Sequence, residues 1–205
     1  MIRNILVAAI ALAALSAGPQ AQAQSGASDA NWQFRCPAAG TVVEPSNGAA
    51  LRFRGEDTSQ PGSCMMSGNQ ARLMGYWRVS EGFYRAAGPR LAGAFANGVN
   101  LASARPIEFS YFGTSLTFDS IVLDERWTAE AGGSVTTPAG TFNTVRVDRY
   151  FVVRGSAFQF TESVWFDRAT NVPVRAVVDH RNFIQAPSLV NWVANEITRP
   201  QTASR

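Results

Sequence analysis

Few side chains in this chain belong to the types that carry catalysis. His180 is the only histidine, so a Ser-His-Asp triad would have to form around it. The chain has no G-x-S-x-G motif, however, and the neighbouring Asp179 should point to the opposite face of the same strand. All 18 basic residues are arginine, and the absence of lysine excludes Schiff-base catalysis and Walker-type phosphate binding. We therefore predict no catalytic residue and no enzymatic activity.

Motifs for metal ions and cofactors are also missing from the sequence. There is no HExxH motif and no EF-hand loop, and one histidine beside two cysteines expected to be oxidised leaves only carboxylates as ligands. No glycine-rich loop opens a helix after a strand, so dinucleotide binding is not supported. The sequence predicts no metal site and no cofactor.

Pairs of carboxylates leave one hydrolytic alternative open. Glu125 with Glu130, or Asp57 with Glu56, are neighbours in the sequence, and glycoside hydrolysis needs two carboxyl groups about 5 to 10 Å apart. The 15 acidic residues will also form near pairs by chance. A hydrolase of this kind would need two acids converging in one cleft, with a strongly shifted pKa for at least one of them.

Cys36 and Cys64 are the only cysteines of the chain. An even pair in an exported chain predicts a disulfide, which here would close a loop of about 28 residues and stabilise the fold by roughly 3 to 4 kcal/mol. The alternative is a redox pair, but redox pairs usually have the much closer CxxC spacing. We predict a structural disulfide.

The best-defined hairpin places a charged pair on an apolar face. Residues 144–154 and 157–167 are predicted as antiparallel strands joined by Gly155-Ser156, which suits a two-residue type II′ turn. This register sets Arg149 opposite Glu162. It also matches the polarity of the other pairs, which are Val153 with Phe158, Phe151 with Phe160, Val147 with Val164 and Val145 with Phe166. The charged pair is either a cross-strand ion pair bridging a gap in the core or the polar part of a groove for an apolar ligand.

Short strands broken by turn residues account for most of the remaining sequence. The further predicted strands are Thr41–Glu44, Ala50–Arg54, Ala71–Arg78, Val174–Arg181 and Leu189–Thr198. For the last of these a helical turn is the alternative, and its good strand formers favour the strand. A short helix is predicted from Pro89 to Asn97, because proline suits a first helical position and Gly98 follows the end.

A change of hydrophobic phase within one predicted strand indicates curvature. Ile107, Phe109 and Tyr111 alternate with polar residues. Further on, Leu116 and Phe118 give way to Ile121, Leu123, Glu125 and Trp127 in the opposite phase, which predicts a bulge near Asp119 or Ser120. Bulges bend a sheet. The predicted fold is therefore mainly β, with a strongly curved antiparallel sheet forming an open or half barrel and one short helix near 89–97.

Residues 1–23 have the features of an export signal. Arg3 precedes an uncharged apolar run from Ile5 to Ala17, and Ala21-Gln22-Ala23 supplies a small-x-small cleavage site. The run is too short to span a membrane. We expect a disordered lead-in at 24–31, a single β-rich domain at 32–198 and a tail at 199–205. Within the domain, 32–104 contains both cysteines and 105–198 the hairpins. The expected location is the periplasm of a Gram-negative source, or otherwise outside the cell.

The charge balance argues against a nucleic-acid partner. Without Arg3 the chain has 17 basic and 15 acidic residues, a net charge of +2. The arginines are scattered singly, whereas nucleic acids and anionic membranes call for a clustered basic stripe.

Residues 105–198 resemble a family of exported bacterial β-proteins of unknown function. The similarity lies in the hairpin segment Thr137-Pro138-Ala139-Gly140-Thr141-Phe142, in Trp165-Phe166, and in the return segment Asn171-Val172-Pro173-Val174-Arg175. Asn171 stands where that family often has glycine, and asparagine also tolerates left-handed backbone angles. The resemblance implies an open antiparallel barrel similar to that of periplasmic lipoprotein carriers, and it implies no catalytic residues.

The sequence thus predicts a non-catalytic exported β-domain that binds an apolar or amphipathic small molecule, a lipid or an envelope protein on the concave face of its sheet. Two alternatives remain: a structural or interaction protein with a filled core, and the carboxylate hydrolase. An apolar pocket of about 300 Å³ or more would favour ligand binding.

Overall fold

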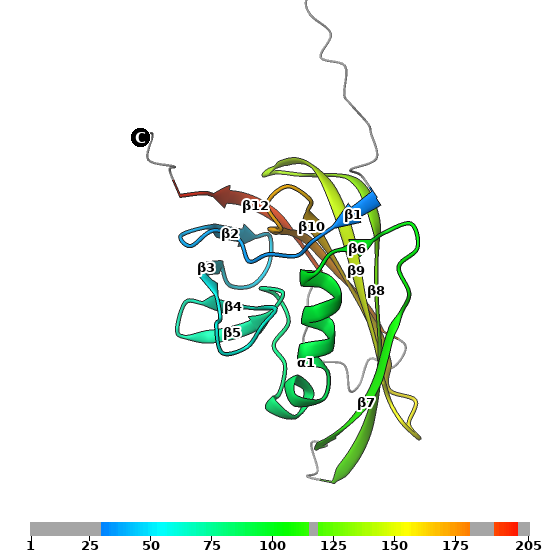
Figure 1. Cartoon of the computed structure of the whole chain (residues 1–205). Helices are drawn as coiled ribbons and strands as arrows, with labels where there is room; N and C mark the ends of the chain where they lie inside the picture. The colour runs from blue at the N-terminus through cyan, green and yellow to red at the C-terminus, as the bar shows by residue number, and fades with distance from the viewer. Residues whose placement is uncertain (1–29, 115–118, 181–190, 201–205) are drawn as a thin grey trace, which may run out of the picture.

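The computed structural model describes residues 30–114, 119–180 and 191–200 (Figure 1). The predicted export signal and most of the predicted lead-in and tail lie outside these residues. The elements are β1 (Asn31–Trp32), β2 (Val42–Pro45), β3 (Leu51–Glu56), β4 (Ser63–Met66), β5 (Gln70–Leu73), α1 (Glu81–Ala96), β6 (Val99–Asn100), β7 (Ile107–Thr114), β8 (Ser120–Thr137), β9 (Gly140–Val153), β10 (Gln159–Asp167), β11 (Pro173–His180) and β12 (Trp192–Thr198).

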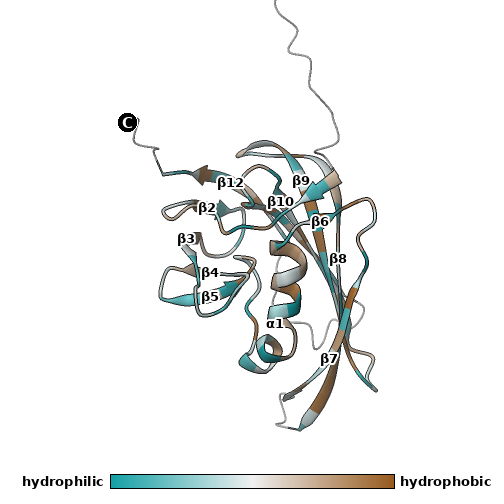
Figure 2. Ribbon diagram, viewed as in Figure 1, coloured by the Kyte–Doolittle hydropathy of each residue, from teal (hydrophilic) through white to brown (hydrophobic). Residues whose placement is uncertain are grey.

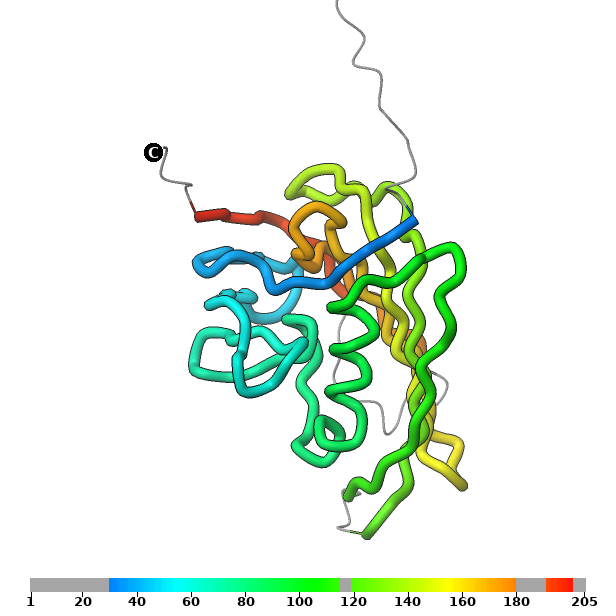
Figure 3. The backbone as a smooth tube through the Cα atoms, viewed as in Figure 1, coloured from blue at the N-terminus to red at the C-terminus, as the bar shows by residue number. Residues whose placement is uncertain are grey.

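One large antiparallel sheet organises the described residues. Its ten strands follow the order β5-β4-β3-β2-β12-β11-β10-β9-β8-β7, so β5 and β7 are its edges. The backbone trace in Figure 3 shows the long strands β7 to β9 sweeping past one side of α1, with the β2 to β5 segment on the other side. The predicted fold class is confirmed: the protein is mainly β, with a curved open antiparallel sheet and one helix.

The predicted β9–β10 register is confirmed. Arg149 pairs with Glu162, Phe151 with Phe160, Val147 with Val164 and Val145 with Phe166. The turn itself differs from the predicted two-residue turn. The backbone N–H of Ser156 donates to the carbonyl of Val153 at 3.0 Å, which closes a β-turn over residues 153–156. Gly155 is the third residue of that turn, with a φ of 78°.

The predicted helix at Pro89–Asn97 is too short, because α1 begins at Glu81. The hydroxyl of Ser80 accepts a hydrogen bond from the backbone N–H of Phe83 at 3.1 Å and caps the first turn. Pro89 therefore lies inside the helix, on its exposed side, where water can replace the backbone donor that proline lacks.

Two stretches that were predicted as single strands each contain a turn at which the chain reverses direction. Thr114 pairs with Ser120, so the phase change near Asp119 reflects a hairpin between β7 and β8, and the predicted bulge at that point is wrong. The predicted strand Ala71–Arg78 is also wrong over its second half. There the chain turns after β5, and Leu73 and Trp77 form an antiparallel bridge.

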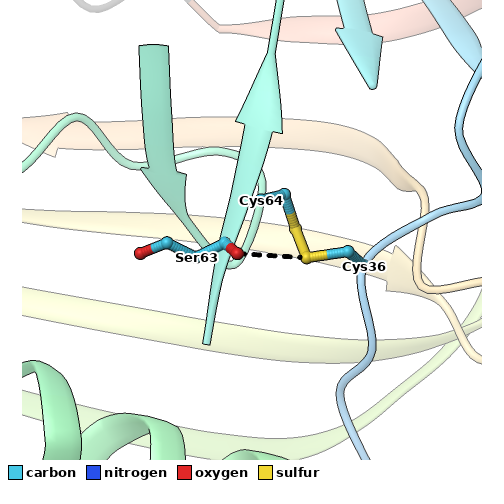
Figure 4. Close-up of a disulfide and its surroundings, with 3 residues drawn as sticks. All are labelled: Cys36, Ser63 and Cys64. Atoms are coloured by element: carbon cyan, nitrogen blue, oxygen red, sulfur yellow. Dashed lines mark hydrogen bonds between the residues drawn. A yellow bond between two sulfur atoms is a disulfide. The ribbon is translucent and has the colours of Figure 1, made fainter. Parts of the chain in front are cut away.

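The predicted disulfide between Cys36 and Cys64 is present. Figure 4 shows that it joins the segment following β1 to strand β4, and that the sulfur of Cys36 faces the carbonyl oxygen of Ser63, 3.4 Å away. Cys64 is fully buried. The bridge therefore fixes the N-terminal segment against the β3–β5 end of the sheet.

The core lies between α1 and the sheet. Figure 2 shows alternating bands of hydrophobic and hydrophilic residues along the long strands, as expected where one face is buried. Phe83 of α1 packs edge-on against Phe109 and Tyr111 of β7. The ring of Trp77 lies 4.7 Å from that of Trp127, so the segment after β5 and strand β8 share one core.

Candidate functional site

A buried ion pair stands on the concave face of the sheet. Arg149 of β9 donates from Nε to one oxygen of Glu125 at 2.9 Å and from Nη2 to the other at 2.6 Å. The Glu125 side chain is fully buried and that of Arg149 is 12% exposed. Two parallel bonds between a guanidinium and a carboxylate form the strongest type of ion pair in proteins.

Two further donors complete the environment of Glu125. Trp127 Nε1 donates to Oε2 at 2.8 Å, and the Tyr111 hydroxyl donates to Oε1 at 2.9 Å. Burial, together with the negative charge of Glu125, raises the pKa of Tyr111 and keeps its hydroxyl protonated. With four donors, both carboxylate oxygens of Glu125 are occupied.

The guanidinium of Arg149 is also surrounded by aromatic rings. Its Cζ lies 5.4 Å from the ring centre of Phe83, 5.6 Å from that of Trp127 and 5.7 Å from that of Phe151. Burial acts to lower the pKa of Arg149, but the charge and hydrogen bonds of Glu125 outweigh it, and the pKa is raised. The arginine is held as a fixed cation.

Glu162 has a very different environment. Its side chain is fully buried, and Oε2 accepts a hydrogen bond from Trp77 Nε1 at 2.7 Å. Oε1 has no hydrogen-bond partner among the described residues. Burial raises the pKa of Glu162, although Arg149 and the neighbouring Tyr76 and Trp77 act in the opposite direction.

The predicted pair of Arg149 and Glu162 is thus brought together, but the ion pair forms elsewhere. The two residues are directly opposite each other in the register. Arg149 instead bonds to Glu125, a diagonal neighbour on β8, where Trp127 is the residue opposite Arg149. Long side chains reach such diagonal positions across a sheet. The positive charge of Arg149 acts to lower the pKa of Glu162.

Beside Glu162 the protein has a pocket of about 610 Å³. It lies between the β2–β3 turn, the segment that follows β5, and strands β9, β10 and β12. Its lining includes the aromatic residues Tyr76, Trp77, Phe151, Phe158, Phe160 and Trp192 together with Arg72, Arg78, Arg149 and Glu162. A pocket of this size that combines several aromatic side chains with a few charged groups is typical of a small-molecule site.

A second pocket of about 530 Å³ adjoins the first. Phe151, Phe158, Arg78 and Arg149 line both pockets, so these side chains form the boundary between the two. The remaining lining comes from the start of α1 and the inner faces of β7 to β9, and includes Phe83, Tyr111, Ile121, Leu123 and Val153. Together the pockets form one extended apolar surface, which we call the concave groove.

Two arginines stand together in the first pocket. The antiparallel bridge between Leu73 and Trp77 places the next residues outward, Arg72 and Arg78, beside each other. Burial and the charge of Arg78 lower the pKa of Arg72. Neither arginine has a carboxylate partner among the described residues, and the buried Nε of Arg72 has no hydrogen-bond acceptor.

The carboxylate pairs that kept hydrolysis open do not form a site. Glu130 is exposed and pairs with Arg146 at 3.3 Å, whereas Glu125 is buried on the other face of β8. Asp57 accepts hydrogen bonds from the backbone N–H and the hydroxyl of Ser59, as in a turn. His180 pairs with Phe160 across β10 and β11.

Sequence reasoning missed Arg72, Arg78, Glu125 and the tight turn at 73–77. The available signal was Gly75 in the middle of an otherwise regular apolar stretch, since glycine often marks a reversal. Glu125 was considered only with its neighbour Glu130, because its place beside Arg149 depends on the β8–β9 register, which shifts at a bulge between Ala131 and Gly133.

Among the described residues, no group of three or more histidine, cysteine or acidic side chains is arranged to hold a metal ion. No helix in the described part of the chain has the length and apolar character needed to cross a membrane.

Comparisons of the chain with protein-family models, with curated proteins and with solved structures gave no match. The resemblance of residues 105–198 to exported β-proteins stays a prediction.

Proposed function

We propose that this protein is an exported, non-catalytic β-domain that binds an apolar or amphipathic small molecule in the concave groove. The observation that carries the proposal is the pair of adjoining pockets, of about 610 and 530 Å³. Phe151 and Phe158 line both of them. Each exceeds the volume of about 300 Å³ at which ligand sites begin.

The chemistry of the groove favours binding over hydrolysis. Glu125, the best-placed second acid beside Glu162, has both oxygens occupied by Arg149, Trp127 and Tyr111. A general base or nucleophile needs an oxygen within reach of the substrate. Glu162 alone provides one carboxyl group, whereas the glycosidase mechanism needs two.

The disulfide supports the exported location. Disulfides form and persist in oxidising compartments such as the periplasm and are rare in the cytosol. The bond between Cys36 and Cys64 therefore agrees with an export signal at residues 1–23. We propose the periplasm for a Gram-negative source.

The proposal can be tested with the neutral apolar dye N-phenyl-1-naphthylamine, whose fluorescence rises in apolar sites. We expect saturable binding to the purified protein, and a loss of affinity of about tenfold or more in Phe151→Ser, because one ring of the groove then becomes small and polar. Phe112→Ser is the matched control, since Phe112 is 76% exposed and lines neither pocket. Equal dye binding by both variants, or none by the wild type, would contradict the proposal.

Native mass spectrometry of the protein purified from its own periplasm gives an independent test. A copurifying small molecule or lipid of defined mass, lost in Phe151→Ser and kept in Phe112→Ser, would support the proposal. A stoichiometric protein partner without any small molecule would instead favour an interaction protein.

A further inference from the structure

The first pocket contains an excess of positive charge that the fold itself does not neutralise. Arg149 is balanced by Glu125 through two hydrogen bonds. Arg72 and Arg78 line the same pocket and have no carboxylate partner among the described residues. Like charges placed side by side on neighbouring strands destabilise a sheet. An anion bound between them would remove that repulsion.

The turn that carries the two arginines is fixed in place. Met74 and Gly75 are both buried, and both have positive φ, 49° and 70°. The backbone N–H of Met74 donates to the carbonyl of Gly62 at 2.8 Å. A non-glycine residue in this backbone region is uncommon and persists only where the surroundings hold it, often beside ligands. The arginines are therefore presented on a rigid support.

Glu162 adds a carboxyl group with one oxygen that lacks a partner. The residue lines the pocket, and its buried Oε1 has no hydrogen-bond partner among the described residues. Because Trp77 donates to Oε2, a proton on this carboxyl group would sit on Oε1. A neutral carboxylic acid is a hydrogen-bond donor and suits an anion as neighbour.

We propose that the ligand of the concave groove is an anionic amphiphile, with its head group bound by Arg72 and Arg78 in the first pocket and its hydrocarbon tail lying over Phe151 and Phe158. This inference rests on the function proposed above and adds the charge and the orientation of the ligand. A carboxylate, sulfonate or phosphate head would present the same acceptor oxygens to the guanidinium groups.

The test compares three amphiphiles that share a dodecyl tail and differ only in the head: dodecanesulfonate, dodecanol and dodecyltrimethylammonium. Binding to the full mature protein is measured by dye displacement below the micelle concentration of each. We expect the sulfonate to bind about tenfold or more tighter than the alcohol, as an added charge-assisted contact allows. The cation should bind more weakly than the alcohol.

Replacing both arginines identifies the head-group site. In Arg72→Gln/Arg78→Gln the affinity for the sulfonate should fall to that for the alcohol, while the affinity for the alcohol stays unchanged. Arg52→Gln/Arg54→Gln is the control, because it removes the same charge from exposed side chains of β3 outside both pockets. A sulfonate preference that survives the first double variant would overturn the assignment.

The outcomes separate this inference from the proposed function. Equal affinity for all three amphiphiles would overturn the anionic head but leave the apolar site intact. Tightest binding of the cation would also overturn it, and would indicate an ionised Glu162 within the aromatic rings. Failure of all three to displace the dye would count against the groove itself.

Discussion

Arg149 lies between two buried carboxylates, directly opposite Glu162 and diagonal to Glu125. It bonds to Glu125, which two other donors also stabilise, while Glu162 is left with Trp77. A buried ion pair is costly to break from one side only, since the remaining charge stays buried without compensation. The side chains of the concave face are therefore divided into a fully bonded group around Glu125 and an incompletely bonded one around Glu162.

Removal of Arg149 should therefore strongly destabilise the fold. We expect Arg149→Met, which keeps the apolar stem, to lower the free energy of unfolding in urea by about 3 to 5 kcal/mol. Arg52→Met breaks the ion pair with Glu44, a single contact at 3.3 Å between side chains that are 54% and 46% exposed. That control should lose about 1 kcal/mol or less. Similar losses in the two variants would mean that the Glu125 pair is not effectively buried.

Glu162 should give the stability a characteristic pH dependence. Its pKa is raised in the folded protein above the ordinary value of 4.5. As the pH rises above 4.5, the unfolded chain loses this proton first, so the free energy of unfolding falls until the folded pKa is passed. Glu162→Gln lacks the titration, and its stability relative to the wild type should increase from pH 4.5 to pH 8.

The comparison is made by urea unfolding at several pH values. Glu108→Gln, at an exposed position of β7, controls for the loss of one negative charge. A stability difference between Glu162→Gln and the wild type that stays constant with pH, or that shifts in the opposite direction, would contradict a raised pKa for Glu162.

At the level of elements, the tight turn at 73–77 determines where the two arginines lie. A Cβ on Gly75 would approach Cε1 of the buried Phe53 to 2.6 Å, and φ at Gly75 is 70°. Gly68 has a similar φ of 76°, but a Cβ there would meet nothing within 4 Å. The two glycines therefore share a backbone requirement and differ in the space around them.

We expect Gly75→Ala to be more destabilising than Gly68→Ala. Both variants should lose about 1 to 2 kcal/mol from the left-handed backbone, and Gly75→Ala a further 1 to 3 kcal/mol or so from overpacking against Phe53. Urea unfolding of the two variants measures the difference directly. Equal losses would show that Phe53 moves aside without cost.

The elements also show why only part of this architecture could be predicted. The β9–β10 register follows from polarity matching alone, and the left-handed backbone expected at Asn171 is present, with φ of 57°. The turn at 73–77 contains no typical turn pair of residues, and Met74 adopts a left-handed backbone conformation, with φ of 49°, that is uncommon for residues other than glycine. The partner of Arg149 was missed because it depends on the β8–β9 register, which shifts at a bulge between Ala131 and Gly133.

The whole molecule is held together across the boundary at residue 105. Strand β2 pairs with β12, with Val42 opposite Thr198. Trp32 of β1 contacts Phe166 of β10, and its Nε1 donates to the side chain of Asn171 at 2.8 Å. The N-terminal part with the cysteines and the C-terminal hairpins thus share one core, and neither encloses the first pocket alone.

This shared core leads to an expectation for the disulfide. Cys36→Ala/Cys64→Ala should lower the free energy of unfolding by about 3 to 4 kcal/mol, because the unfolded chain gains the entropy of an open loop of roughly 28 residues. Unfolding should remain a single transition, since contacts such as Trp77 with Trp127 couple the two parts without the bridge. Tryptophan fluorescence and far-ultraviolet circular dichroism, followed in the same urea series, should give coincident curves. The wild type unfolded in reductant should show the same loss. Two separated transitions in the variant would mean that the bridge, and not the common core, joins the N-terminal part to the hairpins.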